Sequence, residues 1–271
     1  MKKNILIIAC TMLLASPPIF GQALSPDDNI NSRVLRYWDN FNLANQNAAT
    51  IEKTFVNYLQ LLWYADAPTV EKSVSALLNK AENTDSVAFN AISSLFEKYL
   101  YNPNSPFRNE EFYIPVLKYL CASKSADFAT KTRAGFRLKM ALKNRVGELA
   151  NDFEYTLSNG KKGKLSAIKA DYILIFFNNP DCHDCQRVKD ILSSNNLSKI
   201  KVLAIYPDTD LSIWKKTAYP DAWINGYNNT SLKELYDLKA IPTLYLLDKD
   251  KRVILKDADV EQIIRYTRYI F

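Results

Sequence analysis

From about residue 25 to residue 145, apolar residues recur every three or four positions, which is the spacing of one face of an α-helix. Four stripes carry this pattern: Val34, Trp38 and Phe41; Ile51, Phe55, Tyr58, Leu59 and Leu62; Val70, Val74, Leu77, Leu78 and Ala81; and Ala88, Ile92, Leu95, Phe96 and Tyr99. Pro68 stands where a first-turn proline would begin the third helix. Two more helices are expected around residues 112–121 and 126–143, so the first half of the chain predicts an all-α domain.

Two groups of side chains in this helical half invite more than one interpretation. Trp38, Trp63 and Tyr64 are expected in the core rather than in a ligand-binding box. Basic residues gather on and after the last helix: Lys131, Arg133, Arg137, Lys139, Lys143 and Arg145. A solvated helix face is favoured for them over a docking surface. The helical half shows no catalytic constellation.

The pattern changes after Gly147. Residues 152–157 alternate between polar and apolar, and Ser158-Asn159-Gly160 predicts a turn into a returning strand. Strands are expected at residues 152–157, 161–165, 172–177, 201–206, 222–224, 241–247 and 252–255, and helices after Cys182, Asp210, Ser231 and Asp259. Strands that alternate with helices indicate a mixed sheet with helices on both faces. We therefore predict two domains, an all-α helical domain at residues 24–145 and an α/β domain at residues 146–271.

The first residues have the pattern of a signal peptide. Lys2 and Lys3 form a positive start, residues 5–15 are apolar, and two prolines follow. The apolar segment is shorter than the roughly 20 residues of a membrane span. We therefore predict a signal peptide at residues 1–23 and a periplasmic or secreted mature protein. Residues 7–10 loosely resemble a lipobox, but Cys10 lies very early, so a lipid anchor at Cys10 is the less favoured alternative.

Composition narrows the classes of function. The 271 residues are 48% apolar and 24% charged, as in a folded globular protein. The formal net charge is +6, and no basic tract interleaved with aromatic residues supports nucleic-acid binding. Cleavage of the signal peptide would leave Cys121, Cys182 and Cys185, an odd number that argues against a disulfide scaffold. It favours one functional pair, with Cys121 as a buried apolar residue.

That pair is Cys182-His183-Asp184-Cys185, which follows the apolar run at 172–177 and leads into an amphipathic helix. A helix N-terminus stabilises a thiolate, the reactive form of cysteine. Zinc sites use the same spacing but need about four ligands. His183 is the only histidine of the chain, and no second cysteine pair exists. A structural bridge across so short a loop would constrain the unfolded chain little. The motif therefore favours thiol–disulfide redox chemistry, with neither a metal nor another cofactor expected.

Residues from Val146 to the C-terminus resemble the thioredoxin fold, and within it the TlpA/ResA-like periplasmic thiol–disulfide oxidoreductases. The segments that carry the resemblance, in order, are 147–155, the Gly160 turn with Leu165-Ser166, the cysteine motif, Ala240-Ile241-Pro242-Thr243, and 246–254. The helical half resembles an N-terminal domain of unknown function that precedes such modules in secreted bacterial proteins.

The resemblance implies a role for each site residue. Cys182 would be the exposed nucleophile and Cys185 the buried resolving thiol. Pro242, expected in the cis form, would face the cysteines, and the backbone of Ile241 would hold an extended substrate segment. The implied partners are a disulfide-containing protein substrate and a membrane electron donor that reduces the cysteines again.

The motif also departs from the family pattern. Asp181 stands where a tryptophan often precedes the first cysteine, and Phe176 replaces the aspartate that thioredoxins keep beneath the site. With no buried carboxylate, water or Asp184 would take the proton of the resolving thiol. His183, when cationic, stabilises a neighbouring thiolate, whereas Asp181 and Asp184 oppose it. We expect these three residues to tune the site, with opposing effects on the direction of electron flow.

Three other functions compete with thiol–disulfide redox chemistry: a thiol peroxidase, a copper carrier and a binding protein. Peroxiredoxins share the fold but place a threonine and a proline where this chain has Asn179 and Ile175. A copper carrier would need a distal histidine, which this chain lacks. The main alternative is a secreted binding protein whose helical domain recognises a protein or glycan, with the cysteine pair secondary.

Overall fold

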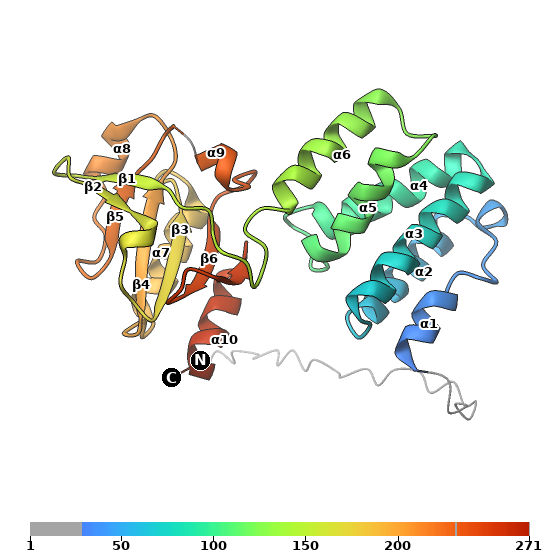
Figure 1. Ribbon diagram of the computed structural model, residues 1–271, viewed down its shortest axis with the longest axis horizontal. Helices are drawn as coiled ribbons and strands as arrows, with labels where there is room; N and C mark the ends of the chain where they lie inside the picture. The colour runs from blue at the N-terminus through green and yellow to red at the C-terminus, as the bar shows by residue number, and fades with distance from the viewer. Residues whose placement is uncertain (1–28, 231, 271) are drawn as a thin grey trace, which may run out of the picture.

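The computed structural model describes residues 29–230 and 232–270, so the predicted signal peptide and its Cys10 lie outside the described residues. A helical domain precedes a sheet domain, as predicted (Figure 1). Among the described helices, none combines the length and the apolar character needed to cross a membrane.

The helical domain is built from helices that begin on asparagine or aspartate. Its elements are α1 (Ile30–Arg36), η1 (Leu43–Asn45), α2 (Ala48–Leu62), α3 (Ala67–Thr84), α4 (Ser86–Phe96), the π-helical η2 (Glu97–Tyr101), α5 (Glu110–Ala122) and α6 (Phe128–Ala141). Each α-helix from α1 to α6 has an Asn or Asp N-cap whose side chain accepts a backbone N–H of the first turn. Such caps satisfy N–H groups that have no partner within the helix. Pro68 lies in the first turn of α3, as predicted.

The predicted apolar stripes form most of the core of this domain. Phe55, Leu62 and Phe96, for example, have no exposed surface. The prediction for Trp38 is confirmed, since 5% of it is exposed, but the predictions for Trp63 and Tyr64 are wrong, at 56% and 75%. Helix α2 ends at Leu62, so these two residues no longer follow the buried face of the helix.

The sheet domain places the strand before the cysteines near the middle of the sheet. Its elements are β1 (Glu154–Leu157), β2 (Lys162–Lys164), η3 (Leu165–Ala167), β3 (Tyr172–Phe177), α7 (His183–Ser194), β4 (Ile200–Tyr206), α8 (Leu211–Lys216), β5 (Ile224–Tyr227), α9 (Leu232–Leu235), β6 (Thr243–Asp248), β7 (Val253–Lys256) and α10 (Val260–Ile270). Within the described residues the strand order is β2-β1-β5-β4-β3-β6-β7. Strand β3 pairs in parallel with β4 and antiparallel with β6.

Alternate residues of β3 enter two different cores. Leu174 and Phe176 pack with α7 and α10 on one face of the sheet. Ile173, Ile175 and Phe177 pack with α9 on the other. Because successive side chains of a strand point to opposite faces, a continuous apolar run indicates a strand covered on both sides. The predicted mixed sheet with helices on both faces is confirmed.

Several predicted strands begin later than the sequence pattern suggested, and two of these shifts have a local cause. The strand expected at residues 222–224 begins at Ile224, because the N–H of Trp223 is engaged in a turn with the Pro220 carbonyl. The strand expected from Ile241 begins at Thr243. Pro242 has no N–H to donate to a sheet, so regular pairing starts after it.

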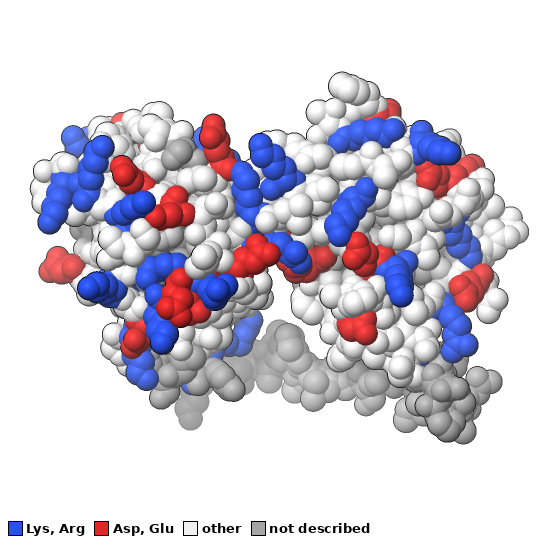
Figure 2. Space-filling view, in the orientation of Figure 1, with Lys and Arg blue, Asp and Glu red and all other residues white. Residues whose placement is uncertain are grey.

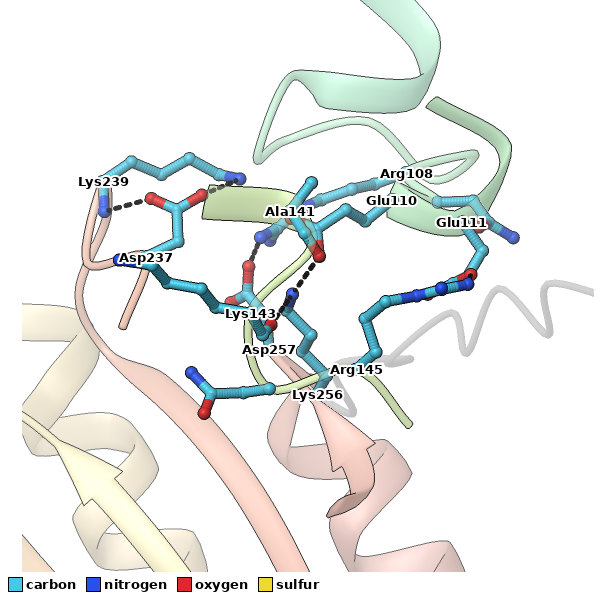
Figure 3. Close-up of polar contacts among 12 residues, drawn as sticks. Arg108, Glu110, Glu111, Ala141, Lys143, Arg145, Asp237, Lys239, Lys256 and Asp257 are labelled. Carbon is cyan, nitrogen blue, oxygen red and sulfur yellow. Dashed lines mark hydrogen bonds and ion pairs between the residues drawn. The ribbon is translucent and has the colours of Figure 1, made fainter. Parts of the chain in front are cut away.

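The two domains are joined by a linker that is bound along the edge of the sheet. The N–H groups of Gly147 and Ala150 donate to Val253 and Lys251 at 2.8 and 2.9 Å. Lys256, whose side chain is 8% exposed, reaches from β7 toward the end of α6 and donates to the carbonyls of Ala141 and Lys143 (Figure 3). It also forms an ion pair with Glu110.

Further charged pairs lie at this junction. Arg108 of the helical domain pairs with Asp257, and Arg145 with Glu111 (Figure 3). On the face shown in Figure 2, acidic and basic side chains are interspersed where the domains meet. The predicted solvated helix face is wrong for Arg137, which is 19% exposed and bonds to Glu97 at 2.8 Å. Lys143 and Arg145 lie beyond the end of α6 at Ala141, where they bond to the Glu234 carbonyl and to Glu111.

Asn144 fixes the start of the linker, and its substitution tests the junction. Its side chain donates to the carbonyl of Leu235 at 2.8 Å and accepts the N–H of Asn151 at 2.7 Å, and the residue is 3% exposed. Its φ is 51°, a region that asparagine tolerates better than alanine. Asn144→Ala should lower the free energy of unfolding by about 3 kcal/mol, from lost hydrogen bonds and backbone strain.

Urea denaturation of the full chain measures this effect. Asn144→Gly is the matched control, because it loses the same hydrogen bonds without the backbone strain; it should cost about 1 kcal/mol less than the alanine variant. An alanine variant as stable as the wild type would contradict the role given to Asn144.

Candidate redox site

The two cysteines lie on either side of the first turn of α7. Strand β3 ends at Phe177, a short turn follows, and Cys182 is the N-cap of the helix with extended backbone angles. Asn179 holds the turn: its side chain accepts the N–H of Asp181 at 3.0 Å and donates to Asp208 at 2.8 Å. Cys182 is partly exposed, whereas Cys185, one helical turn later, is 2% exposed.

The segment with Pro242 lies beside Cys182. In the register of β3 and β6, Phe177 is opposite Thr243, so the residues before Thr243 lie next to the turn that follows Phe177. The Ile241–Pro242 peptide bond is cis, as predicted. The Cys182 thiol donates to the Ile241 carbonyl, with 3.7 Å between Sγ and O. An exposed sulfur and the backbone of Ile241 thus share one surface, where an extended peptide could lie.

The environment of Cys185 differs from that of Cys182. Burial raises the pKa of the Cys185 thiol to about 12, and the neighbouring Cys182 raises it further, against a hydrogen bond from the Asn179 N–H. That N–H lies 3.4 Å from the Cys185 sulfur. Cys185 packs among the residues that α7 and β3 contribute to the core. The structure therefore has one accessible thiol and one thiol that stays protonated until its surroundings change.

Tyr219 and Asn178 are uncharged polar residues in the pocket beside Cys185. Phe176, which stands where thioredoxins keep an aspartate, is fully buried. Tyr219 donates from its hydroxyl to Asn178 Oδ1 at 2.6 Å, and Asn178 donates to the Phe176 carbonyl at 3.0 Å. Burial raises the pKa of Tyr219, and the nearby Cys185 adds to this. Sequence reasoning missed Asn178 and Tyr219, because nothing in the chain indicates a contact across 41 residues.

A polar pocket of about 490 Å³ gives water access to Cys185. Its lining includes Cys185, Tyr219, Asp181 and Asp190. Asp184, which the sequence proposed as a proton acceptor, is not in that lining; it is 68% exposed and lies 3.7 Å from Arg187 Nε. His183 is exposed. Asp181 and Asp190 therefore share this pocket with the resolving thiol, whereas Asp184 and His183 lie at the outer surface.

In the part of the chain that the structure describes, no group of three or more His, Cys, Asp or Glu side chains could hold a metal ion. The three described cysteines, Cys121, Cys182 and Cys185, are all free thiols. Cys121 is partly buried against the helical core.

Comparison with known proteins agrees with this architecture. DUF5106, a domain of unknown function, matches residues 25–144. A solved thioredoxin-like protein from Bacteroides caccae is 40% identical, with a TM-score of 0.84, and the match covers 97% of this chain and 99% of that one. The chain therefore belongs to the thioredoxin-like proteins, with an N-terminal domain of unknown function.

Other solved structures match less than half of this chain. The C-terminal domain of an uncharacterized protein from Bacteroides fragilis is 45% identical, with a TM-score of 0.44, covering 45% of this chain and 96% of that one. The thioredoxin domain of a thiol-disulfide oxidoreductase from Bacteroides vulgatus is 15% identical, with a TM-score of 0.40, covering 46% and 97%. A comparison with curated proteins gave no match.

The difference between the two thiols predicts selective alkylation. With a pKa of about 12, Cys185 is about one part in ten thousand thiolate at pH 8, and only the thiolate reacts. Iodoacetamide should therefore modify Cys182 of the reduced, folded protein well before Cys185. Raising the pH by one unit should speed the reaction of Cys185 about tenfold, because its thiolate fraction rises by that factor below the pKa.

Peptide mapping by mass spectrometry after timed alkylation measures both rates. In urea the two cysteines should react at similar rates, which provides the control. Equal rates in the folded protein would contradict the assignment of Cys185 as the protected thiol.

Proposed function

We propose that this protein is a thiol–disulfide oxidoreductase that reduces disulfide bonds of protein substrates through a Cys182/Cys185 cycle. One observation carries the proposal. The Cys182 thiol lies at the exposed start of α7, within 3.7 Å of the Ile241 carbonyl, and the second thiol is buried one turn away. In this arrangement only the Cys182 sulfur can contact a substrate disulfide, and the buried Cys185 thiol reacts in a later step.

The first step is attack by the Cys182 thiolate on one sulfur of a substrate disulfide. The substrate S–S bond breaks, a mixed disulfide forms with Cys182, and the other substrate sulfur leaves as a thiolate that takes a proton from water. The backbone of Ile241 and Pro242 lies beside the reacting sulfur and would hold the substrate segment in an extended form. Main-chain contacts of this kind accept many side chains, which suits a general protein substrate.

In the second step Cys185 releases the substrate. Its thiol gives its proton to water in the pocket that Asp181 and Asp190 line. The thiolate attacks Cys182, the mixed disulfide breaks, and the second substrate sulfur leaves as a thiol. One substrate disulfide has then become two thiols, and the two electrons have come from the Cys182 and Cys185 thiols, which are now joined as a disulfide. A dithiol donor must reduce that bond before the next cycle.

The setting of this chemistry is also part of the proposal. The signal peptide expected at residues 1–23 supports a periplasmic or secreted protein, with lipid anchoring at Cys10 as the less favoured form. An extracytoplasmic reductase needs electrons from across the membrane, so we propose a membrane electron donor as its second partner. His183, Asp181 and Asp184 lie next to Cys182 in the motif, where a cationic His183 would stabilise the thiolate and the two carboxylates would oppose it.

Turnover of a protein disulfide tests the proposal. The purified reduced protein should reduce the interchain disulfides of insulin, with dithiothreitol as donor. Cys182→Ser should fall to the uncatalysed rate, because the attacking sulfur is gone. Cys185→Ser, reduced and then freed of dithiothreitol before it meets insulin, should instead accumulate a mixed disulfide with the substrate, since no second thiol resolves it.

Insulin turbidity and non-reducing electrophoresis read out these two outcomes. Cys121→Ser serves as the matched control, and it should keep wild-type turnover because Cys121 lies in the other domain. A folded wild-type protein that neither reduces nor forms disulfides would contradict the proposed function.

A further inference from the structure

The loop that carries Ile241 is held by the helical domain as well as by the sheet. Between α9 and β6, Asp237 and Lys239 turn toward the helical domain, with side chains that are 15% and 18% exposed. The Lys239 ammonium lies 3.0 Å from Asp237 Oδ2 and 4.5 Å from the centre of the Tyr101 ring. Charged side chains are seldom so buried unless specific partners hold them.

The ring of Tyr101 is held in place by Tyr113 and Arg137 of the helical domain. It stacks on Tyr113, with the centroids 5.3 Å apart. The guanidinium of Arg137 lies 4.1 Å from the Tyr101 ring centre and also bonds to the Tyr113 hydroxyl at 3.3 Å. A cation over an aromatic face is attracted by the negative charge of that face. The helical domain thus presents a rigid ring to Lys239.

The contact between Lys239 and Tyr101 is close in sequence to the residues beside Cys182. Lys239 precedes Ile241 by two residues, and regular strand β6 begins at Thr243. Thr243 adds a hydrogen bond from its hydroxyl to the Ala240 carbonyl at 2.5 Å. The position of the Ile241 carbonyl beside Cys182 is therefore set from both sides, by β6 pairing after it and by the Tyr101–Lys239 contact before it.

The start of the same loop is tied to the linker. The carbonyl of Leu235, the last residue of α9, accepts the side-chain N–H groups of Asn144 and Asn151 at 2.8 and 3.3 Å. Figure 3 shows Lys239 and Asp237 on one side of this junction, and Lys256, Asp257 and Arg108 on the other. The helical domain and linker thus contact the loop before and after Asp237.

We propose that Tyr101 and Lys239 are positioning residues, through which the helical domain holds the Ile241–Pro242 segment in the form that binds protein substrates. This proposal rests on the proposed function. The two residues act through the backbone of Ile241 and do not touch the sulfurs. A protein disulfide needs that backbone to hold its extended segment, whereas a small disulfide needs only the exposed Cys182 sulfur.

The experiment compares two substrates across matched variants. Tyr101→Leu and Lys239→Met remove the contact from either side, and Tyr101→Phe keeps the aromatic face. Lys98→Met is the control, because Lys98 lies 5.2 Å from the Tyr99 ring centre, a similar pair within the helical domain. KM and kcat are measured for insulin with dithiothreitol as donor. For the small disulfide 5,5′-dithiobis(2-nitrobenzoate), the rate of reaction with the reduced protein is measured without a donor. Circular dichroism first shows that each variant is folded.

Tyr101→Leu and Lys239→Met should raise KM for insulin roughly tenfold with little change in kcat. Their rates with the small disulfide, and all rates of Tyr101→Phe and Lys98→Met, should stay within about twofold of wild type. Hydrogen exchange at the amides of Ala240 and Ile241 should be faster in the first two variants only. Exchange and insulin KM that match the wild type would overturn the proposal, as would an equal loss on both substrates.

The two proposals fail in different ways. If the wild type reduces neither substrate, the proposed function fails, and hydrogen exchange at Ala240 and Ile241 still decides whether the Tyr101–Lys239 contact holds the loop. If the wild type reduces both and Tyr101→Leu behaves identically, the proposed function stands and the positioning role is wrong.

Discussion

The position of β3 between a parallel and an antiparallel strand is the constraint on which the rest of the structure depends. β3 ends at Phe177, and the turn that follows leads to Cys182. The antiparallel strand β6 begins at Thr243, directly opposite Phe177. One pairing register therefore brings two segments that are distant in the sequence to a single point. Ile173 to Phe177 have no exposed surface, and burial of each such side chain contributes about 2 kcal/mol. A one-residue slip of this register would exchange the side chains packed in the two cores and shift Thr243 away from Phe177.

The junction between the domains adds a second constraint, made mainly of charged and polar groups. Lys256 donates to the carbonyls of Ala141 and Lys143 and pairs with the Glu110 carboxylate. Asn144 bonds to the Leu235 carbonyl and to the N–H of Asn151. Buried ion pairs add little net stability, but the loss of one partner is costly because the other charge stays buried. Such contacts fix geometry more than they add stability. The helical domain is thereby tied to the loop before Pro242, which connects a domain without catalytic residues to the site.

Features that depend on local pattern could be predicted from the sequence. The run at 172–177 is buried on both faces, as its unbroken apolar character indicated. The cis bond at Pro242 was expected from the family resemblance that the Ile-Pro-Thr segment carries, not from local pattern. Trp63 and Tyr64 were misplaced because periodicity does not mark the residue at which a helix ends. Tyr219 beside Asn178, and Lys239 over Tyr101, are contacts of the tertiary structure. No local pattern encodes them.

The central claim is that Cys182 and Cys185 form one reversible two-electron couple. The full chain is equilibrated in buffers of graded dithiothreitol or glutathione potential, quenched with acid, labelled with a maleimide and mapped by mass spectrometry. The labels on Cys182 and Cys185 should disappear together, with a tenfold change in the ratio per about 30 mV, while Cys121 stays labelled. Independent titration of the two cysteines, or labels retained on both at every potential, would contradict the claim.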